Sequence, residues 1–186
     1  MGKTIRYLPA MLLVVTPGLA QDTAPAMWRK IYEVLSHPRC ANCHVGPDNV
    51  PIWSGPSYGP YPRPHGMNIS AGESRIGAEY IACSACHTRH NSQVLHGPPG
   101  APRWLLPPVS MQWFGKSASE ICAQIKDPER NGHRTIARIA EHIEHDEVVH
   151  WGWAPGPGRE PAPYSAAELV EFVKQWDAAG TPCPTE

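Results

Sequence analysis

The sequence predicts a mainly α-helical fold with long loops rich in proline and glycine. The 186 residues include 22 prolines and 16 glycines, which favour turns and extended loops. Apolar residues recur at helical spacing in four segments, three of them in the last third of the chain. Strand-like alternation is weak throughout. A chain of this length is expected to form one domain.

In the first half of the chain, only residues 27–36 show a sustained helical pattern of apolar side chains. Residues 45–75 and 88–113 are rich in proline and glycine and lack lasting periodicity, so both are predicted to be loops. A short helical turn is expected over residues 78–82, between these loops.

Two Ser-x-x-Glu sequences are capping boxes, in which serine and glutamate satisfy the free N–H groups at a helix start. They predict helices over residues 117–126 and 165–179. Between them, residues 135–144 place isoleucines along one stripe of a third helix. Gly180 and Pro182 end the last helix, because glycine favours a helix terminus and proline cannot continue the helix.

The N-terminus reads as an export signal. Lys3 and Arg6 form a basic start, residues 8–15 are mostly apolar, and residues 18–20 supply small side chains for cleavage before Gln21. The alternative is a retained anchor, but the apolar run is much shorter than the ~20 residues that cross a membrane.

We therefore predict a signal peptide over residues 1–20 and a single domain over residues 21–186, located in the periplasm. The whole chain has 16 basic and 17 acidic residues, and removal of the signal leaves 14 basic and 17 acidic residues. This charge argues against a nucleic-acid partner, which would favour an excess of basic residues. No transmembrane span is expected in the mature chain.

Four of the six cysteines occur in two copies of the pattern Cys-x-x-Cys-His. The thiols of this pattern attach haem covalently, and the histidine binds its iron as the proximal ligand. The sequence therefore predicts a compact dihaem cytochrome c, wrapped around two covalently bound haem c groups. The predicted haem-binding residues are Cys40, Cys43 and His44 for one haem and Cys83, Cys86 and His87 for the other.

Other uses of the paired cysteines fit less well. A four-thiolate zinc site is usually cytosolic, and the 39 residues between the two pairs exceed the roughly 15–20 of common zinc ribbons. A thioredoxin-like redox pair needs a βαβ setting, which the pattern does not indicate. Ordinary disulfides would leave the histidine after each pair unexplained.

The other two cysteines, Cys122 and Cys183, lie outside these motifs. In an oxidising compartment they are expected to form a disulfide, with a free thiol as the alternative. Such a disulfide would tie the C-terminus to the predicted helix over residues 117–126.

The spacing of the motifs limits the architecture. Cys40 and Cys83 are 43 residues apart, which is too few for a complete one-haem domain around each motif. The two haems are therefore expected to share one core, close enough to exchange electrons. Tryptophans in the later part of the chain are expected to pack around the haems. They are Trp104, Trp113, Trp151 and Trp153.

The sixth, distal position on each iron has several candidate ligands. His65 and Met67 lie between the motifs in a tight Pro/Gly segment, and we favour His65. His142 flanks the apolar stripe of its predicted helix and is preferred over Met111 and His145. A second histidine favours a lower reduction potential than methionine, and an open position permits substrate chemistry.

Six short strings of the chain are specific as sequences. They are Leu35–Cys40, Arg63–Asn68, Lys126–Pro128, Arg130–Gly132, Gly152–Trp153 and Pro155–Arg159. Through these strings the chain resembles exported dihaem cytochromes associated with molybdenum hydroxylases of the isoquinoline 1-oxidoreductase type. The resemblance implies a redox partner protein, such as a molybdenum hydroxylase, and an electron-accepting role for this chain. A weaker similarity is to the small dihaem subunit of periplasmic nitrate reductases.

Two classes of function are consistent with the motifs. The preferred one is an electron carrier with two six-coordinate haems, and no catalytic residue is assigned. The alternative is an enzyme similar to dihaem peroxidases, with one haem left open, although such enzymes are considerably longer. A gas or redox sensor is a third hypothesis, but no signalling domain is evident.

Overall fold

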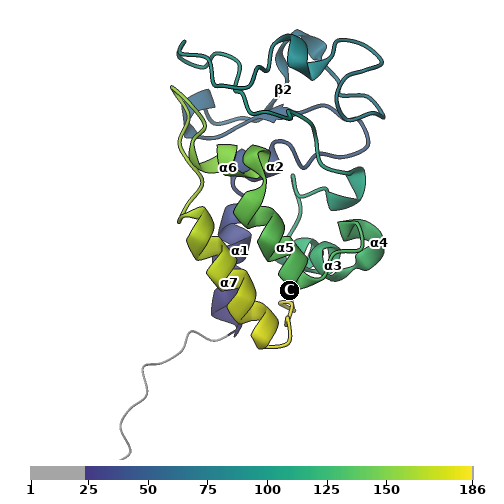
Figure 1. The fold of residues 1–186 in the computed structure, drawn as a ribbon, viewed down its shortest axis with the longest axis vertical. Coiled ribbons are helices and arrows are strands. Elements are labelled where there is room, and N and C mark those ends of the chain that lie inside the picture. Colours follow the sequence, from purple (N-terminus) through teal and green to yellow (C-terminus); the bar gives the residue numbers. More distant parts are fainter. Residues whose placement is uncertain (1–23, 186) are drawn as a thin grey trace, which may run out of the picture.

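The computed structural model describes residues 24–185, and the expected signal peptide over residues 1–20 lies outside this range. Helices form one half of the molecule, and the other half consists mainly of loops (Figure 1). The prediction of a mainly helical fold is thus confirmed. In chain order the helices are α1 (Ala24–Leu35), α2 (Pro38–Ala41), α3 (Ala118–Lys126), α4 (Pro128–Asn131), α5 (Ile136–His145), α6 (Glu147–His150) and α7 (Ala166–Ala178).

The helical half is organised around α7, which packs against both α1 and α5 (Figure 1). Along α1, one face is buried, and its Trp28 ring lies 4.8 Å from the ring of Trp176 on α7. Full burial of each large apolar side chain contributes about 1.5–3 kcal/mol, so this face stabilises the helix pair strongly. The buried side chains of α1 are Met27, Trp28, Ile31, Val34 and Leu35.

The four helices predicted from apolar periodicity are present as α1, α3, α5 and α7. Both capping boxes form, at Ser117 with Glu120 and at Ser165 with Glu168. The pattern did not predict α2, α4 and α6, because each is only four residues long and too short to show a period.

The helical turn expected over residues 78–82 is wrong. The backbone N–H of Tyr80 donates to Gly77 in a single turn, and Ala82 is extended. Gly77 has a φ of 73°, a conformation that breaks helical continuity here and favours glycine. A 3₁₀ turn begins one residue after the expected segment, at Cys83–Ala85.

The loop half has little apolar core of its own. A two-residue antiparallel pair, β1 (Ile52–Trp53) with β2 (Arg63–Pro64), is its only sheet within the described residues. A small cluster of Val45, Ala71 and Leu106 is buried beneath it. Residues 76–99, which include the second motif, contain no buried apolar side chain. Something other than a conventional core must therefore hold that segment.

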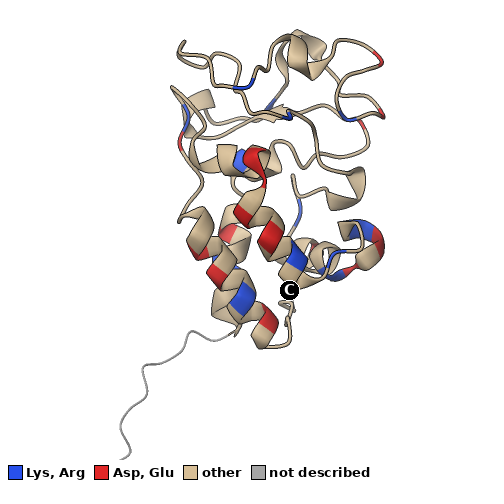
Figure 2. Ribbon diagram, in the orientation of Figure 1, with Lys and Arg blue, Asp and Glu red and all other residues tan. Residues whose placement is uncertain are grey.

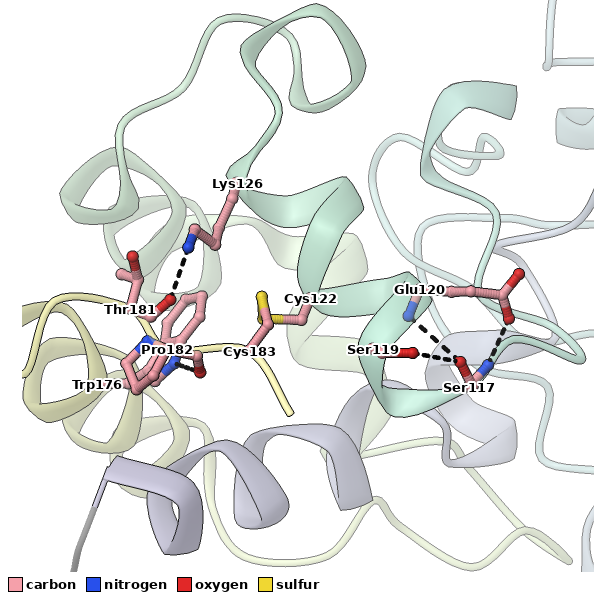
Figure 3. The surroundings of a disulfide bond; sticks show 9 residues. All are labelled: Ser117, Ser119, Glu120, Cys122, Lys126, Trp176, Thr181, Pro182 and Cys183. Carbon is pink, nitrogen blue, oxygen red and sulfur yellow. Dashed lines mark hydrogen bonds between the residues drawn. A yellow bond between two sulfur atoms is a disulfide. The ribbon is translucent and has the colours of Figure 1, made fainter. Parts of the chain in front are cut away.

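The disulfide between Cys122 and Cys183 is confirmed, and it joins α3 to the C-terminal segment (Figure 3). Two hydrogen bonds hold the same segment. The indole N–H of Trp176 donates to the carbonyl of Pro182 at 2.9 Å, and Lys126 donates to Thr181 at 2.8 Å. The chain end is thereby fixed against α3 and α7.

We expect Cys183→Ser to lower the free energy of unfolding by about 2–4 kcal/mol, because the disulfide closes a loop of 61 residues and restricts the unfolded chain. Chemical denaturation followed by circular dichroism measures the change. Wild-type protein with the disulfide reduced should lose a similar amount, whereas Ser119→Ala on the same helix should lose much less. Equal midpoints for Cys183→Ser and wild type would contradict the prediction.

No helix within residues 24–185 is long and apolar enough to cross a membrane.

Candidate cofactor site

The first motif lies on and just after α2, at the junction of the two halves. His37 caps this short helix, its ring nitrogen accepting from the backbone N–H of Arg39. The N–H groups of Cys43 and His44 both donate to the carbonyl of Cys40, so the chain turns tightly. The two thiols and the imidazole of the motif are therefore presented within a little more than one helical turn.

The ring of His44 is held from two directions. Its Nδ1 lies 2.7 Å from the carbonyl oxygen of Met111, and its ring stacks on Trp113 with centroids 3.4 Å apart and planes 3° apart. Burial lowers the pKa of His44 to about 3, despite the opposing hydrogen bond to Met111, so the ring is neutral at pH 7. A neutral imidazole carries one N–H, and a carbonyl only accepts, so the proton is on Nδ1. The lone pair on Nε2 is left for a metal ion.

A cavity of about 580 Å³ opens beside His44, between the helical half and the loops. Its walls combine the first motif with apolar side chains of α1, α5 and α7, which is the lining expected for a large, flat, apolar cofactor. All four tryptophans expected to pack around the haems belong to this lining. Ten residues with roles predicted from the sequence line this cavity. They are Cys40, Cys43, His44, Trp104, Met111, Trp113, His142, His145, Trp151 and Trp153.

The distal candidates His142, Met111 and His145 all line this cavity. His142 lies in the last turn of α5, with Nδ1 3.5 Å from a carboxylate oxygen of Asp146. Asp146 is itself fixed as the N-cap of α6. Met111 differs, because its backbone carbonyl is bound to Nδ1 of His44, on the side of the ring away from Nε2.

The second motif repeats the arrangement of the first. His87 Nδ1 lies 2.8 Å from the carbonyl oxygen of Pro99, and the ring stacks on Trp104 with centroids 4.6 Å apart and planes 5° apart. Burial lowers the pKa of His87 to about 4, so this ring is also neutral at pH 7, with its proton on Nδ1. The thiols are less protected than in the first motif, since Cys86 is exposed and Cys83 half-buried.

Of the two distal candidates between the motifs, His65 is the one that lies beside His87. The two ring centroids are 6.0 Å apart. An imidazole nitrogen binds a first-row metal ion at about 2.0 Å, so two imidazoles on opposite sides of one ion have centroids about 6 Å apart. His65 Nδ1 lies 2.9 Å from the carbonyl of Gly66, which again leaves Nε2 for a metal. Met67, two residues away, is 85% exposed.

The Cys43 thiol of the first motif lies in a buried and charged setting. Burial raises the pKa of the Cys43 thiol to about 11, and the nearby Cys83 thiol adds to this increase. Arg39 and Arg75 act in the opposite direction on the same thiol. The geometric link between the motifs is Trp104, which lines the cavity beside the first motif and stacks on His87 of the second. That the two haems share one core stays a prediction.

Two buried arginines beside the first motif were not indicated by any sequence pattern. The acidic residues of α5 and α7, red in Figure 2, are exposed, whereas Arg39 and Arg75 are only 5% and 9% exposed. Burial lowers the pKa of both guanidinium groups. A buried charge is costly unless it is paired, and both arginines have partners within the chain. Arg39 forms an ion pair with Glu160 at 3.6 Å and donates to the carbonyl of Ser54 at 2.9 Å. Arg75 donates to Oδ1 of Asn49.

Several buried donors at the site have no hydrogen-bond partner within the described chain. They include Nε of Arg39, Nε and Nη2 of Arg75, and the indole N–H groups of Trp28 and Trp113. Buried donors in proteins are normally satisfied, so unpaired ones in one region indicate a ligand that accepts hydrogen bonds. Haem fits this description, because it combines an apolar macrocycle with two carboxylates.

The four motif thiols do not gather as a structural zinc site would require. Among residues 24–185, no group of three or more His, Cys, Asp or Glu side chains is arranged to hold a bare metal ion. A zinc site of paired cysteines needs four such ligands in a tetrahedron.

Comparisons with known proteins give no independent assignment of the site. No family model, curated protein or solved structure matches the chain. The assignment therefore depends on the geometry of the site itself.

Proposed function

We propose that this chain is a periplasmic dihaem c-type cytochrome that passes single electrons between a dehydrogenase or hydroxylase and a respiratory acceptor. The observation that carries the proposal is the repeated geometry of the two motifs. In each, a neutral histidine directs its Nδ1 proton to a backbone carbonyl and stacks flat on a tryptophan, which leaves Nε2 as a metal ligand. Such outer contacts typically fix the orientation of a metal-binding imidazole.

The proposed roles follow from this geometry. Cys40 and Cys43 form thioethers to one haem, and Cys83 and Cys86 form them to the other. His44 and His87 are the proximal ligands. When bound, each haem supplies reversible one-electron chemistry, and the protein controls its potential through ligands, burial and nearby charge.

We assign His142 as the distal ligand of the first haem and His65 as that of the second. His142 lines the cavity of His44 and is oriented by Asp146, and the ring of His65 lies 6.0 Å from that of His87. With a histidine available at each distal position, neither haem needs an open site. This favours an electron carrier over a peroxidase-like enzyme.

The proposal is tested by expressing the protein with a c-type haem maturation system and counting haems by the pyridine haemochrome method. Two covalent haems per chain are expected, with electron paramagnetic resonance (EPR) spectra of two low-spin, bis-histidine ferric centres. Cyanide should bind neither haem readily. A high-spin haem that reacts with peroxide would favour the enzyme alternative, and a chain without covalent haem would overturn the proposal.

The nature of the partner is proposed from the resemblance alone. A molybdenum hydroxylase would deliver electrons one at a time to this chain, and a respiratory acceptor would remove them. Reduction of the purified cytochrome by such a hydroxylase and its substrate, followed in the visible haem bands, tests this pairing.

A further inference from the structure

One side chain, Trp104, touches both candidate sites. It forms part of the wall of the first cavity, together with His44 and His142. It also stacks on the ring of His87, the proximal ligand proposed for the second haem, with the two planes 5° apart. Because the indole has two faces and an edge, it can serve both sites at once.

The indole of Trp104 is itself held in place by Trp151. The two rings meet edge to face, with centroids 5.1 Å apart and planes 88° apart. Trp151 is buried, and it also lines the first cavity. Edge-to-face pairs are favoured by the charge distribution of aromatic rings and contribute about 0.5–1.5 kcal/mol beyond burial.

Asn91 joins this aromatic pair to the second motif. Its Oδ1 accepts from the indole N–H of Trp151 at 2.9 Å and from the backbone N–H of Gly100 at 3.0 Å. Its Nδ2 donates to the carbonyl of Ala154 at 2.8 Å. Gly100 directly follows Pro99, the residue whose carbonyl holds His87. His87 is therefore connected to Trp104 in two ways. One is the direct stack of the two rings, and the other runs through the Pro99–Gly100 backbone, Asn91 and Trp151.

We infer that Trp104 is a positioning residue shared by the two haem sites, which sets the ring plane of His87 and at the same time forms part of the wall of the first cavity. The inference rests on the proposed function, because it concerns how the two haems are held. Trp113 is the matched comparison. Trp113 stacks on His44 in the same way and lines the first cavity. It lies in the core of the helical half and, among the described contacts, has none with His87 of the second site.

The experiment compares Trp104→Leu, Trp104→Phe and Trp113→Phe in the haem-loaded protein. Trp104→Leu is expected to keep both covalent haems, to change the EPR g-values of the second haem, and to let imidazole or cyanide bind more readily at the first. Trp104→Phe should restore most of these properties, because it keeps an aromatic face. Trp113→Phe should alter the spectrum of the first haem alone.

A change confined to one haem in Trp104→Leu would overturn the inference, as would equal behaviour of the leucine and phenylalanine variants. Should Trp104→Leu not accumulate, Asn91→Leu provides the second test, since it removes the hydrogen bonds that hold the aromatic pair. Changes at both haems support sharing, and a change at the second haem alone contradicts it. Wild-type protein without two covalent haems would instead contradict the proposed function.

Discussion

Replacement of Cys83 and Cys86 by alanine is expected to leave the helical half folded around one haem and to unfold residues 76–99. These residues contain no buried apolar side chain, so only polar and aromatic contacts within the chain, such as the hydrogen bonds of Asn91 and the stack of His87 on Trp104, offset the cost of ordering them. That cost is about 1–2 kcal/mol for each residue of backbone. If the proposed function holds, the second haem would offset most of this cost through contacts with side chains that are otherwise exposed. They include Tyr80, Ile81, Val94 and Leu95.

Hydrogen exchange measured by mass spectrometry tests this expectation. Peptides from residues 76–99 should exchange at least about tenfold faster in the double variant, which reports local rather than global opening. Peptides from α1 and α7 should change little. Ser84→Ala, inside the same motif, is the control and should keep both haems and wild-type exchange. Unchanged protection of residues 76–99 from hydrogen exchange in the double variant would show that these loops stay ordered without the second haem.

Replacement of His142 by alanine is expected to convert the first haem from six-coordinate low-spin to high-spin, and to make it bind cyanide. Met111→Leu, in the same cavity, should leave the first haem low-spin, since the carbonyl of Met111 holds the proximal ring and its sulfur is not the assigned ligand. His65→Ala and Met67→Leu form the corresponding pair for the second haem. Electronic absorption and EPR spectra distinguish the spin states.

The residue at position 142 is also expected to control the reduction potential of the first haem. His142→Met should raise the reduction potential of the first haem by on the order of 0.1 V, within the roughly 0.8 V that axial ligation spans in haem proteins. A low-spin first haem in His142→Ala, combined with a high-spin one in Met111→Leu, would assign the distal role to the methionine instead.

Some features of this protein could be predicted from local sequence. The four longer helices follow from apolar side chains at helical spacing, and two of them begin at capping boxes that involve only four consecutive residues. The Cys122–Cys183 pair followed from the expected export to an oxidising compartment and from the lack of another role for these cysteines. The helices are indicated by residues close in sequence, and the disulfide by eliminating other roles for the two cysteines.

Other features depend on residues that are far apart in sequence. His65 and His87 are separated by 22 positions, and only the path of the loops brings their rings to 6.0 Å. The carbonyls of Met111 and Pro99 that orient the proximal rings belong to loops without periodicity. Backbone carbonyls have no residue type, so no sequence motif could have indicated them.

The sequence by itself determined the cofactor expectation, the four longer helices and the candidate ligands, because side-chain spacing along the chain is local chemistry. Only the tertiary structure decided which histidine lies beside which motif, that Arg39 and Arg75 are buried, and that Trp104 serves both sites. The physical reason is that burial and ring stacking are properties of the assembled chain. They arise from contacts between segments whose order in the sequence does not specify their distance in space.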